Sequence, residues 1–245
     1  MSGNYAQMML RLLTVFSRLT VVLGMMALSL AVAAEIESAK DAYRQGDDVL
    51  ASQRYRELAK QGDPEAQFLL GKMYNYGQGI DQDYPEAVKW YRAAADQDYA
   101  KAQRNLAVMY ARGHGVTKDT DQAIQWFKKA SARGDDWAPM LLGMIYAAGD
   151  GVPEDYEEAV KWYRLAADRS NQQAQFVLGV LYARGEEVPR DNVQAYMWLN
   201  LAALSGAKEA REARAMVAER LTSEEIVEAH RRTREWRPQK RDEPH

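Results

Sequence analysis

The chain has 245 residues, a formal net charge of −3 and no cysteine. The lack of cysteine excludes disulfide bonds, thiolate metal sites and a cysteine nucleophile. The small negative charge indicates no general affinity for nucleic acid. Hydrophobic residues make up 47% of the chain and charged residues 27%, which is typical of a globular protein with a sizeable core.

Residues 1–34 differ in composition from the rest of the chain. They contain two basic residues, Arg11 and Arg18, and no acidic residue, and an apolar run ends in small residues at Ala33 and Ala34. This pattern is typical of a bacterial secretory signal. We expect a signal peptide at 1–34, cleaved near Ala33 or Ala34, and a periplasmic or secreted mature protein. An uncleaved membrane anchor is the alternative, although the run is shorter than the ~20 residues that span a bilayer.

An internal repeat of thirty-six residues organises most of the remaining chain. Four copies align without a gap, at 63–98, 99–134, 135–170 and 171–206. Single residue types recur in columns, which include Trp90, Trp126, Trp162 and Trp198; Tyr74, Tyr110, Tyr146 and Tyr182; and Ala87, Ala123, Ala159 and Ala195. A degenerate copy at 35–62, with Arg54 in the tryptophan column, is expected to cap the N-terminal end. A fixed period of this length predicts stacked supersecondary units.

Each copy predicts two helices joined by a loop. In the third copy, Leu142 and Tyr146 share one face of a first helix, and Ala159 and Trp162 begin the apolar stripe of a second. Glycine at the start of the loop suits a left-handed residue that ends the first helix. A second loop glycine recurs in three copies, but the fourth has Glu187 at this position. We therefore expect the fourth loop to differ.

Acidic residues cluster where each second helix begins. Asp155 is followed three residues later by Glu158, and the other copies pair aspartate with glutamate or glutamine at the same spacing. This spacing resembles a capping box, in which the aspartate accepts a hydrogen bond from an orphan backbone N–H. A catalytic carboxylate has no reason to recur in every repeat. We interpret the clusters as helix caps and the tryptophan column as core packing, with a ligand-stacking role as the alternative for the tryptophans.

The segment 207–236 is expected to form C-terminal capping helices, followed by a disordered tail at 237–245. The inward positions are Ala210, Ala213 and Val217 on the first helix and Ile226, Val227 and His230 on the second. A capping box at Thr222 and Glu225 opens the second helix. Its arginines alternate with glutamates, which favours a solvated face over a nucleic-acid or lipid site.

Residue patterns typical of enzymes are lacking. The three histidines, His114, His230 and His245, are too far apart for ligand-spaced pairs. The sequence has no Gly-rich phosphate loop, nucleophile elbow or dinucleotide fingerprint. We therefore expect no catalytic residue, no metal site, no cofactor and no nucleic-acid partner.

The repeat residues resemble those of a known family. The pattern Ala-x₃-Leu-Gly-x₂-Tyr-x₂-Gly-x-Gly-Val, then Asp-x₃-Ala-x₂-Trp-Tyr/Phe-x₂-Ala-Ala, is similar to the Sel1-like repeat (SLR), a relative of the tetratricopeptide repeat, and covers Ala66 to Ala203. The resemblance implies an all-α, right-handed α-solenoid of antiparallel helix pairs with a concave inner face. It also implies an adaptor that holds proteins or peptides. Some cysteine-rich relatives are linked to β-lactam binding or hydrolysis, but this chain has no cysteine.

The same resemblance suggests where a partner binds. By analogy with tetratricopeptide packing, the first helices line the concave groove with Phe68, Lys72, Asn75, Arg104, Val108, Trp137, Met140, Met144, Phe176 and Val180. The set predicts a polar, basic end that holds carboxylates or carbonyls, and an apolar end that methionines make adaptable. Packing between repeats is the alternative role for these residues.

We expect an exported, non-catalytic scaffold or adaptor that binds a protein or peptide in this groove. The alternative is an envelope module that recognises cell-wall glycan or assists cell-wall enzymes. A hydrolase related to the β-lactam-binding relatives is a third, weaker hypothesis. The sequence does not name the partner or the oligomeric state.

Overall fold

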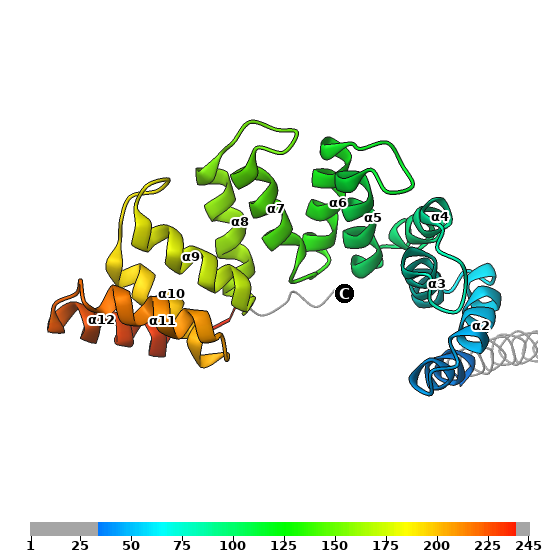
Figure 1. Ribbon diagram of the computed structural model, residues 1–245, viewed down its shortest axis with the longest axis horizontal. Helices are drawn as coiled ribbons and strands as arrows, with labels where there is room; N and C mark the ends of the chain where they lie inside the picture. Colours follow the sequence, from blue (N-terminus) through cyan, green and yellow to red (C-terminus); the bar gives the residue numbers. More distant parts are fainter. Residues whose placement is uncertain (1–33, 239–245) are drawn as a thin grey trace, which may run out of the picture. The chain divides into compact units, whose positions relative to one another are not determined.

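The computed structural model describes residues 34–238, and every regular element in this range is a helix (Figure 1). The predicted signal segment therefore lies outside the described residues except for Ala34, as does the predicted tail from residue 239. A helix at 34–44 precedes α2 (Asp48–Lys60), α3 (Pro64–Tyr76), α4 (Tyr84–Ala95), α5 (Ala100–Arg112), α6 (Thr120–Ala132), α7 (Ala138–Ala148), α8 (Tyr156–Asp168), α9 (Gln172–Arg184), α10 (Asn192–Leu204), α11 (Lys208–Ala218) and α12 (Ser223–Glu235).

The chain divides into two compact units, residues 1–83 and 84–245. In the first unit, α2 packs on α3. In the second, the pairs α5–α6, α7–α8 and α9–α10 run antiparallel, and each second helix packs on the first helix of the next pair (Figure 1). The helices α11 and α12 both pack on α10. This alternation confirms the all-α solenoid of antiparallel helix pairs, because each pair buries an apolar face that it cannot bury alone.

The alanine and leucine columns form the core of the repeats. The alanine column is completely buried, at Ala87, Ala123, Ala159 and Ala195, and so is the leucine column, at Leu70, Leu106, Leu142 and Leu178. Small residues let paired helices approach closely. A Cβ on Gly143 of α7 would lie 2.5 Å from the ring of Tyr163 on α8, far inside van der Waals contact.

The tryptophan column is less buried than the sequence predicts. Trp126 and Trp162 are only partly buried against the core, and only Trp198 is buried, at 3% exposure. The following residue in each repeat occupies the deepest position, as at Phe127, which is 2% exposed, and Tyr163, which is 4% exposed. Trp126 and Trp162 therefore pack against the edge of the core, as the core-packing interpretation expects, while the following residue of the same apolar stripe takes the deepest position.

The aspartate caps are confirmed. Asp119, Asp155 and Asp191 each accept a hydrogen bond of 2.9 Å from the backbone N–H three residues later. The backbone N–H of each of these three aspartates donates instead to a tyrosine carbonyl in the first helix of its repeat, at Tyr110, Tyr146 and Tyr182, so the reciprocal half of the box is not formed there. Glu158 instead accepts a hydrogen bond from the indole N–H of Trp162, at 2.9 Å. A complete capping box is described for α12, between Thr222 and Glu225.

The loop glycines permit close contact with the preceding repeat. Gly151 has φ +78°, and a Cβ at this position would lie 2.2 Å from Oγ1 of Thr120 at the start of α6. In the described chain, positive φ at a non-glycine residue is limited to Asp98 and Ser170. Glu187 therefore does not take the left-handed conformation of Gly151, and the fourth loop differs as predicted.

The C-terminal helices follow the prediction in part. Ala210 and Val217 of α11 are buried, and His230 of α12 lies edge-on to the ring of Tyr196, 5.3 Å between centroids. Val227 was assigned to the inward stripe of α12, but it is 65% exposed. The inward position is taken by a small alanine two residues later, because α12 packs closely on α10.

Candidate partner-binding surface

Three of the predicted groove residues lie on α3, in the first unit. Phe68 is only 8% exposed, so it offers almost no surface to a partner. The Lys72 ammonium lies 5.8 Å from the centre of the Tyr43 ring. The backbone carbonyl of Asn75 accepts a hydrogen bond from the side chain of Gln82, at 2.8 Å. The other seven predicted residues belong to the second unit.

Arg104 of α5 does not provide a free cation. Its Nη1 lies 2.9 Å from Oδ2 of Asp135, and the two side chains are 23% and 3% exposed. The other oxygen of Asp135 accepts hydrogen bonds from the backbone N–H groups of Trp137, at 3.0 Å, and Ala138, at 2.8 Å. The prediction that Arg104 holds a partner's carboxylate is corrected, because Arg104 already neutralises the carboxylate that opens α7. Its role is to position the start of that helix.

Two large apolar side chains of α7 are exposed. Trp137, at the N-terminal end of the helix, is 52% exposed, and Met144 is 50% exposed. They are seven residues apart, so they lie on one face of the helix, with the partly buried Leu141 between them. Met140 was predicted to join them, but it is 5% exposed and belongs to the core that α8, α9 and α10 share. We call Trp137, Leu141 and Met144 the α7 stripe.

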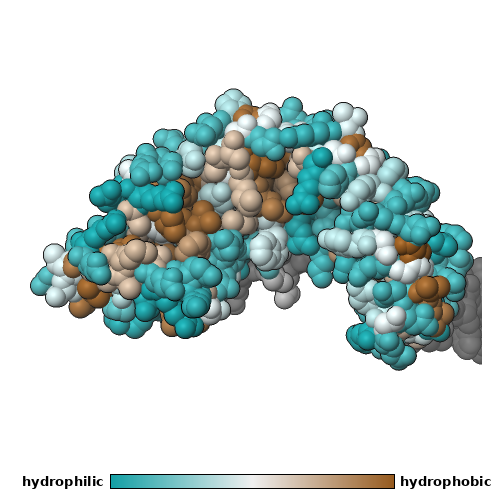
Figure 2. Space-filling model, viewed as in Figure 1, coloured by the Kyte–Doolittle hydropathy of each residue, from teal (hydrophilic) through white to brown (hydrophobic). Residues whose placement is uncertain are grey.

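The remaining predicted residues pack between repeats. Val108 of α5 is partly buried against one hydrophobic core, and Phe176 and Val180 of α9 are partly buried against another. These three therefore follow the packing alternative and contribute only their outer edges to the surface. Figure 2 shows hydrophobic residues reaching the surface over α7 to α10.

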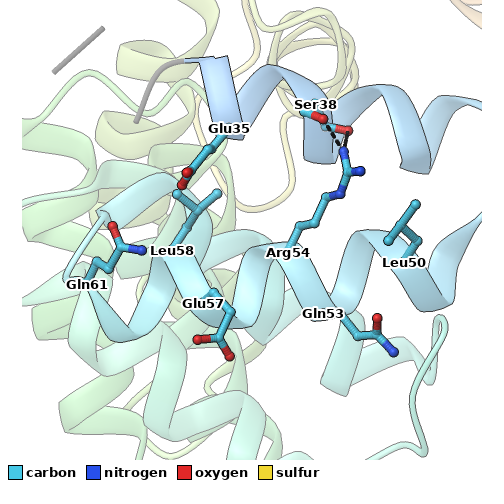
Figure 3. Close-up of a pocket in the computed structure, with 8 residues that line it drawn as sticks. All are labelled: Glu35, Ser38, Leu50, Gln53, Arg54, Glu57, Leu58 and Gln61. Carbon is cyan, nitrogen blue, oxygen red and sulfur yellow. Dashed lines mark hydrogen bonds between the residues drawn. The ribbon is translucent and has the colours of Figure 1, made fainter. Parts of the chain in front are cut away.

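The first unit contains a cavity of about 430 Å³ between the helix at 34–44 and α2. Arg54, which replaces the tryptophan of the other copies, extends across this cavity and donates hydrogen bonds to the backbone carbonyl and the hydroxyl of Ser38 (Figure 3). Glu35 and Glu57 add two carboxylates to the lining. The cavity is thus polar at its edge. Arg54, the one positively charged residue of its lining, already donates hydrogen bonds within the protein.

Within residues 34–238, no group of three or more His, Cys, Asp or Glu side chains is arranged to hold a metal ion. None of the helices described there is both long and apolar enough to cross a membrane.

Comparison with known proteins identifies the repeat. The Sel1 repeat family model matches residues 64–99, 100–135, 140–171 and 172–206, which together exceed half of the chain. The chain belongs to the Sel1 repeat family. Proteins of this family are generally protein–protein interaction modules, and Sel1 repeat scaffolds are typically non-catalytic. No curated protein matches the chain.

Solved structures include similar Sel1 repeat proteins. A Sel1 repeat protein from Oxalobacter formigenes is 34% identical, with a TM-score of 0.67, and the match covers 74% of this chain and 76% of that one. A putative Sel1 repeat protein from Klebsiella pneumoniae is 26% identical over 76% of this chain and 93% of that one, with a TM-score of 0.49. The Escherichia coli protective antigen c5321, which displays an SLR fold, is 26% identical over 84% and 60%, with a TM-score of 0.44.

Sequence reasoning missed two features of the second unit. Asp135 shares its repeat position with Asp63 and Asn171, whose side chains cap α3 and α9, and it also links α5 to the start of α7. A cavity lies between α9, α11 and the α9–α10 loop. Two departures from the repeat columns mark it in the sequence, Glu187 in place of glycine and Leu199 in place of an aromatic residue.

Proposed function

We propose that this Sel1 repeat protein is a non-catalytic adaptor that captures a segment of a partner protein on the α7 stripe. The exposure of Trp137 and Met144 on one helix face is the observation that carries this proposal. Tryptophan is enriched at the centres of protein interfaces, where it contributes a large share of the binding energy. Methionine adapts its shape to different partners.

The base of the stripe is held in place before a partner arrives. The backbone N–H of Trp137 donates to the Asp135 carboxylate. Arg104 of α5, in the preceding helix pair, donates to the same carboxylate. A side chain whose backbone is already ordered loses less conformational entropy on binding. This arrangement supports a binding role, since an exposed tryptophan contributes little to stability by itself.

We also propose that the protein acts outside the cytoplasm. The basic start, apolar run and small residues of 1–34 support export. N-terminal sequencing of the protein purified from its native host tests this. We expect a mature N-terminus near Ala33 or Ala34, and a soluble product that retains Met1 would contradict export.

The α7 stripe is tested by affinity capture with a double variant, Trp137→Ser with Met144→Ser. The control is Leu204→Ser with Val227→Ser, which removes two side chains that are 73% and 65% exposed elsewhere in the same unit. Both variants should keep the parent's helical circular dichroism, because all four side chains are exposed. Quantitative mass spectrometry then compares the proteins retained from an envelope extract.

We expect at least one protein to be retained by the parent and the control but lost by the stripe variant. Purified peptidoglycan sacculi provide a second arm of the experiment. Equal retention of every protein by both variants would overturn the proposed protein partner. It would also be overturned if the parent and the control sediment with sacculi and the stripe variant does not.

A further inference from the structure

A second candidate binding site lies at the C-terminal end of the repeats. A cavity of about 370 Å³ is bounded by the end of α9, the α9–α10 loop and α11. Its apolar lining includes Val180, Leu199 and Val217, and Met216, which is 59% exposed, lies at its edge. The cavity shares no side chain with the α7 stripe. Val180, which sequence analysis assigned to the groove, lines it.

The cavity coincides with a break in the repeat pattern. Leu199 stands where the preceding repeats have Tyr163 and Phe127, and leucine fills less space than an aromatic ring. Across the cavity, α11 contributes the small side chain of Ala213. Leu199 is itself completely buried and packs against Gly179 of α9, so the accessible apolar lining is that of Val180, Ala213 and Met216.

Three arginines surround this apolar space. Arg184, Arg190 and Arg220 line the cavity together with a single carboxylate, that of Glu186. Arg190 donates to the backbone carbonyl of Arg184, at 2.9 Å, and Arg220 donates to the carbonyl of Ala183, at 3.2 Å. Within residues 34–238, none of the three arginines forms an ion pair, whereas other arginines of the same unit do. A guanidinium has five N–H donors, so each arginine keeps donors for a ligand.

We propose that this cavity binds an acidic segment of a partner protein, in which an apolar side chain adjoins one or more carboxylates. The apolar side chain packs against the accessible lining at Val180, Ala213 and Met216. The carboxylates accept hydrogen bonds from Arg184, Arg190 and Arg220. Charge complementarity supports this occupant, because planar guanidinium groups pair with carboxylates in a two-pronged geometry. The proposal rests on the proposed protein-binding function but uses a different surface.

The apolar lining favours a protein segment over a phosphate polymer. Phosphate groups satisfy arginines equally well, but a nucleic-acid backbone has no aliphatic side chain to pack against Val180 and Met216. An oligonucleotide and anionic lipid vesicles are therefore included as test arms.

The test is a titration of the purified protein into a fluorescein-labelled peptide, followed by fluorescence anisotropy. The probe peptide carries two leucines and three glutamates in a glycine–serine background, and its matched control replaces the glutamates by glutamines. We expect the acidic peptide to bind and the amide peptide to bind at least about tenfold more weakly. Raising the ionic strength from about 0.05 M to about 0.5 M should weaken the acidic peptide's binding, because exposed charge pairs are screened.

The variants separate the pocket from the general charge of the protein. Arg184→Glu should weaken the acidic peptide about ten- to hundredfold, and Arg184→Lys should restore part of the loss. Arg211→Glu is the matched control, since Arg211 is exposed on α11 but does not line the cavity. Ala213→Phe should also abolish binding, by filling the space without changing any charge.

Four results would overturn the pocket. The first is no binding of the acidic peptide, and the second is equal weakening of binding by Arg184→Glu and Arg211→Glu. The third is Arg184-dependent binding of the oligonucleotide or of phosphatidylglycerol vesicles without binding of the peptide. The fourth is loss of peptide binding in Trp137→Ser but not in Arg184→Glu, which would assign the peptide to the α7 stripe. The affinity capture described above is unaffected by these outcomes, so the two proposals fail separately.

Discussion

Replacing Phe127 by alanine tests whether the residue after each tryptophan is the main core aromatic. Phe127 is 2% exposed and lies in a core formed by α5, α6 and α7. Removing a fully buried phenylalanine costs about 3–5 kcal/mol of unfolding free energy. For a protein of this size each kcal/mol lowers the melting temperature by about 2–4 °C, so we expect a decrease of about 6–20 °C.

The neighbouring Trp126→Ala should cost less. Trp126 is only partly buried, and its distinct interaction is the Lys129 ammonium, 4.0 Å from the ring centre. An exposed cation–π contact contributes about 0.5–1 kcal/mol. With the partial loss of packing we expect about 1–2 kcal/mol in total, below the about 3–5 kcal/mol of Phe127→Ala.

The measurement is thermal unfolding followed by circular dichroism at the helical minimum, with Phe127→Leu as the matched control. The chain itself uses leucine at this position in the fourth repeat, as Leu199, so this variant should lose less than about 1.5 kcal/mol. A Trp126→Ala variant that melts at or below the temperature of Phe127→Ala would refute the reasoning, because the tryptophan would then be the main core residue.

Two further predictions concern the contact between α7 and α8. Gly143→Ala places a methyl group 2.5 Å from the Tyr163 ring. We therefore expect its free energy of unfolding in denaturant to fall by about 1–3 kcal/mol. Ala107 already carries a methyl group at the same repeat position, so the control Ala107→Gly has no such clash to relieve. Burial raises the pKa of Tyr163 to about 12 from its usual 10. The folded state keeps this tyrosine neutral where the unfolded state ionises it, so its contribution to stability is complete below pH 10 and is lost as the pH rises toward 12. Tyr163→Phe should therefore lose less stability than the parent between these pH values in alkaline urea titrations, and parallel curves would contradict this.

The repeat unit was predictable from sequence because it depends on local rules. Spacing along a helix placed the alanine and leucine columns on one face, and aspartates such as Asp155 mark helix starts because a short carboxylate satisfies an orphan backbone N–H. The stacking of helix pairs followed from the repeat itself, since a single pair cannot bury its apolar face. Membership of the Sel1 repeat family followed from the same columns.

The surface was decided only by tertiary structure. The sequence assigned Arg104, Trp137 and Met140 to one groove, yet one is paired with Asp135, one is exposed and one is buried. Periodicity places a residue on a helix face, but it does not determine how closely the next helix approaches that face or which charge meets it there. Those distances depend on side-chain volumes from three helices at once, as at the cavity that residues of α9, α10 and α11 line together.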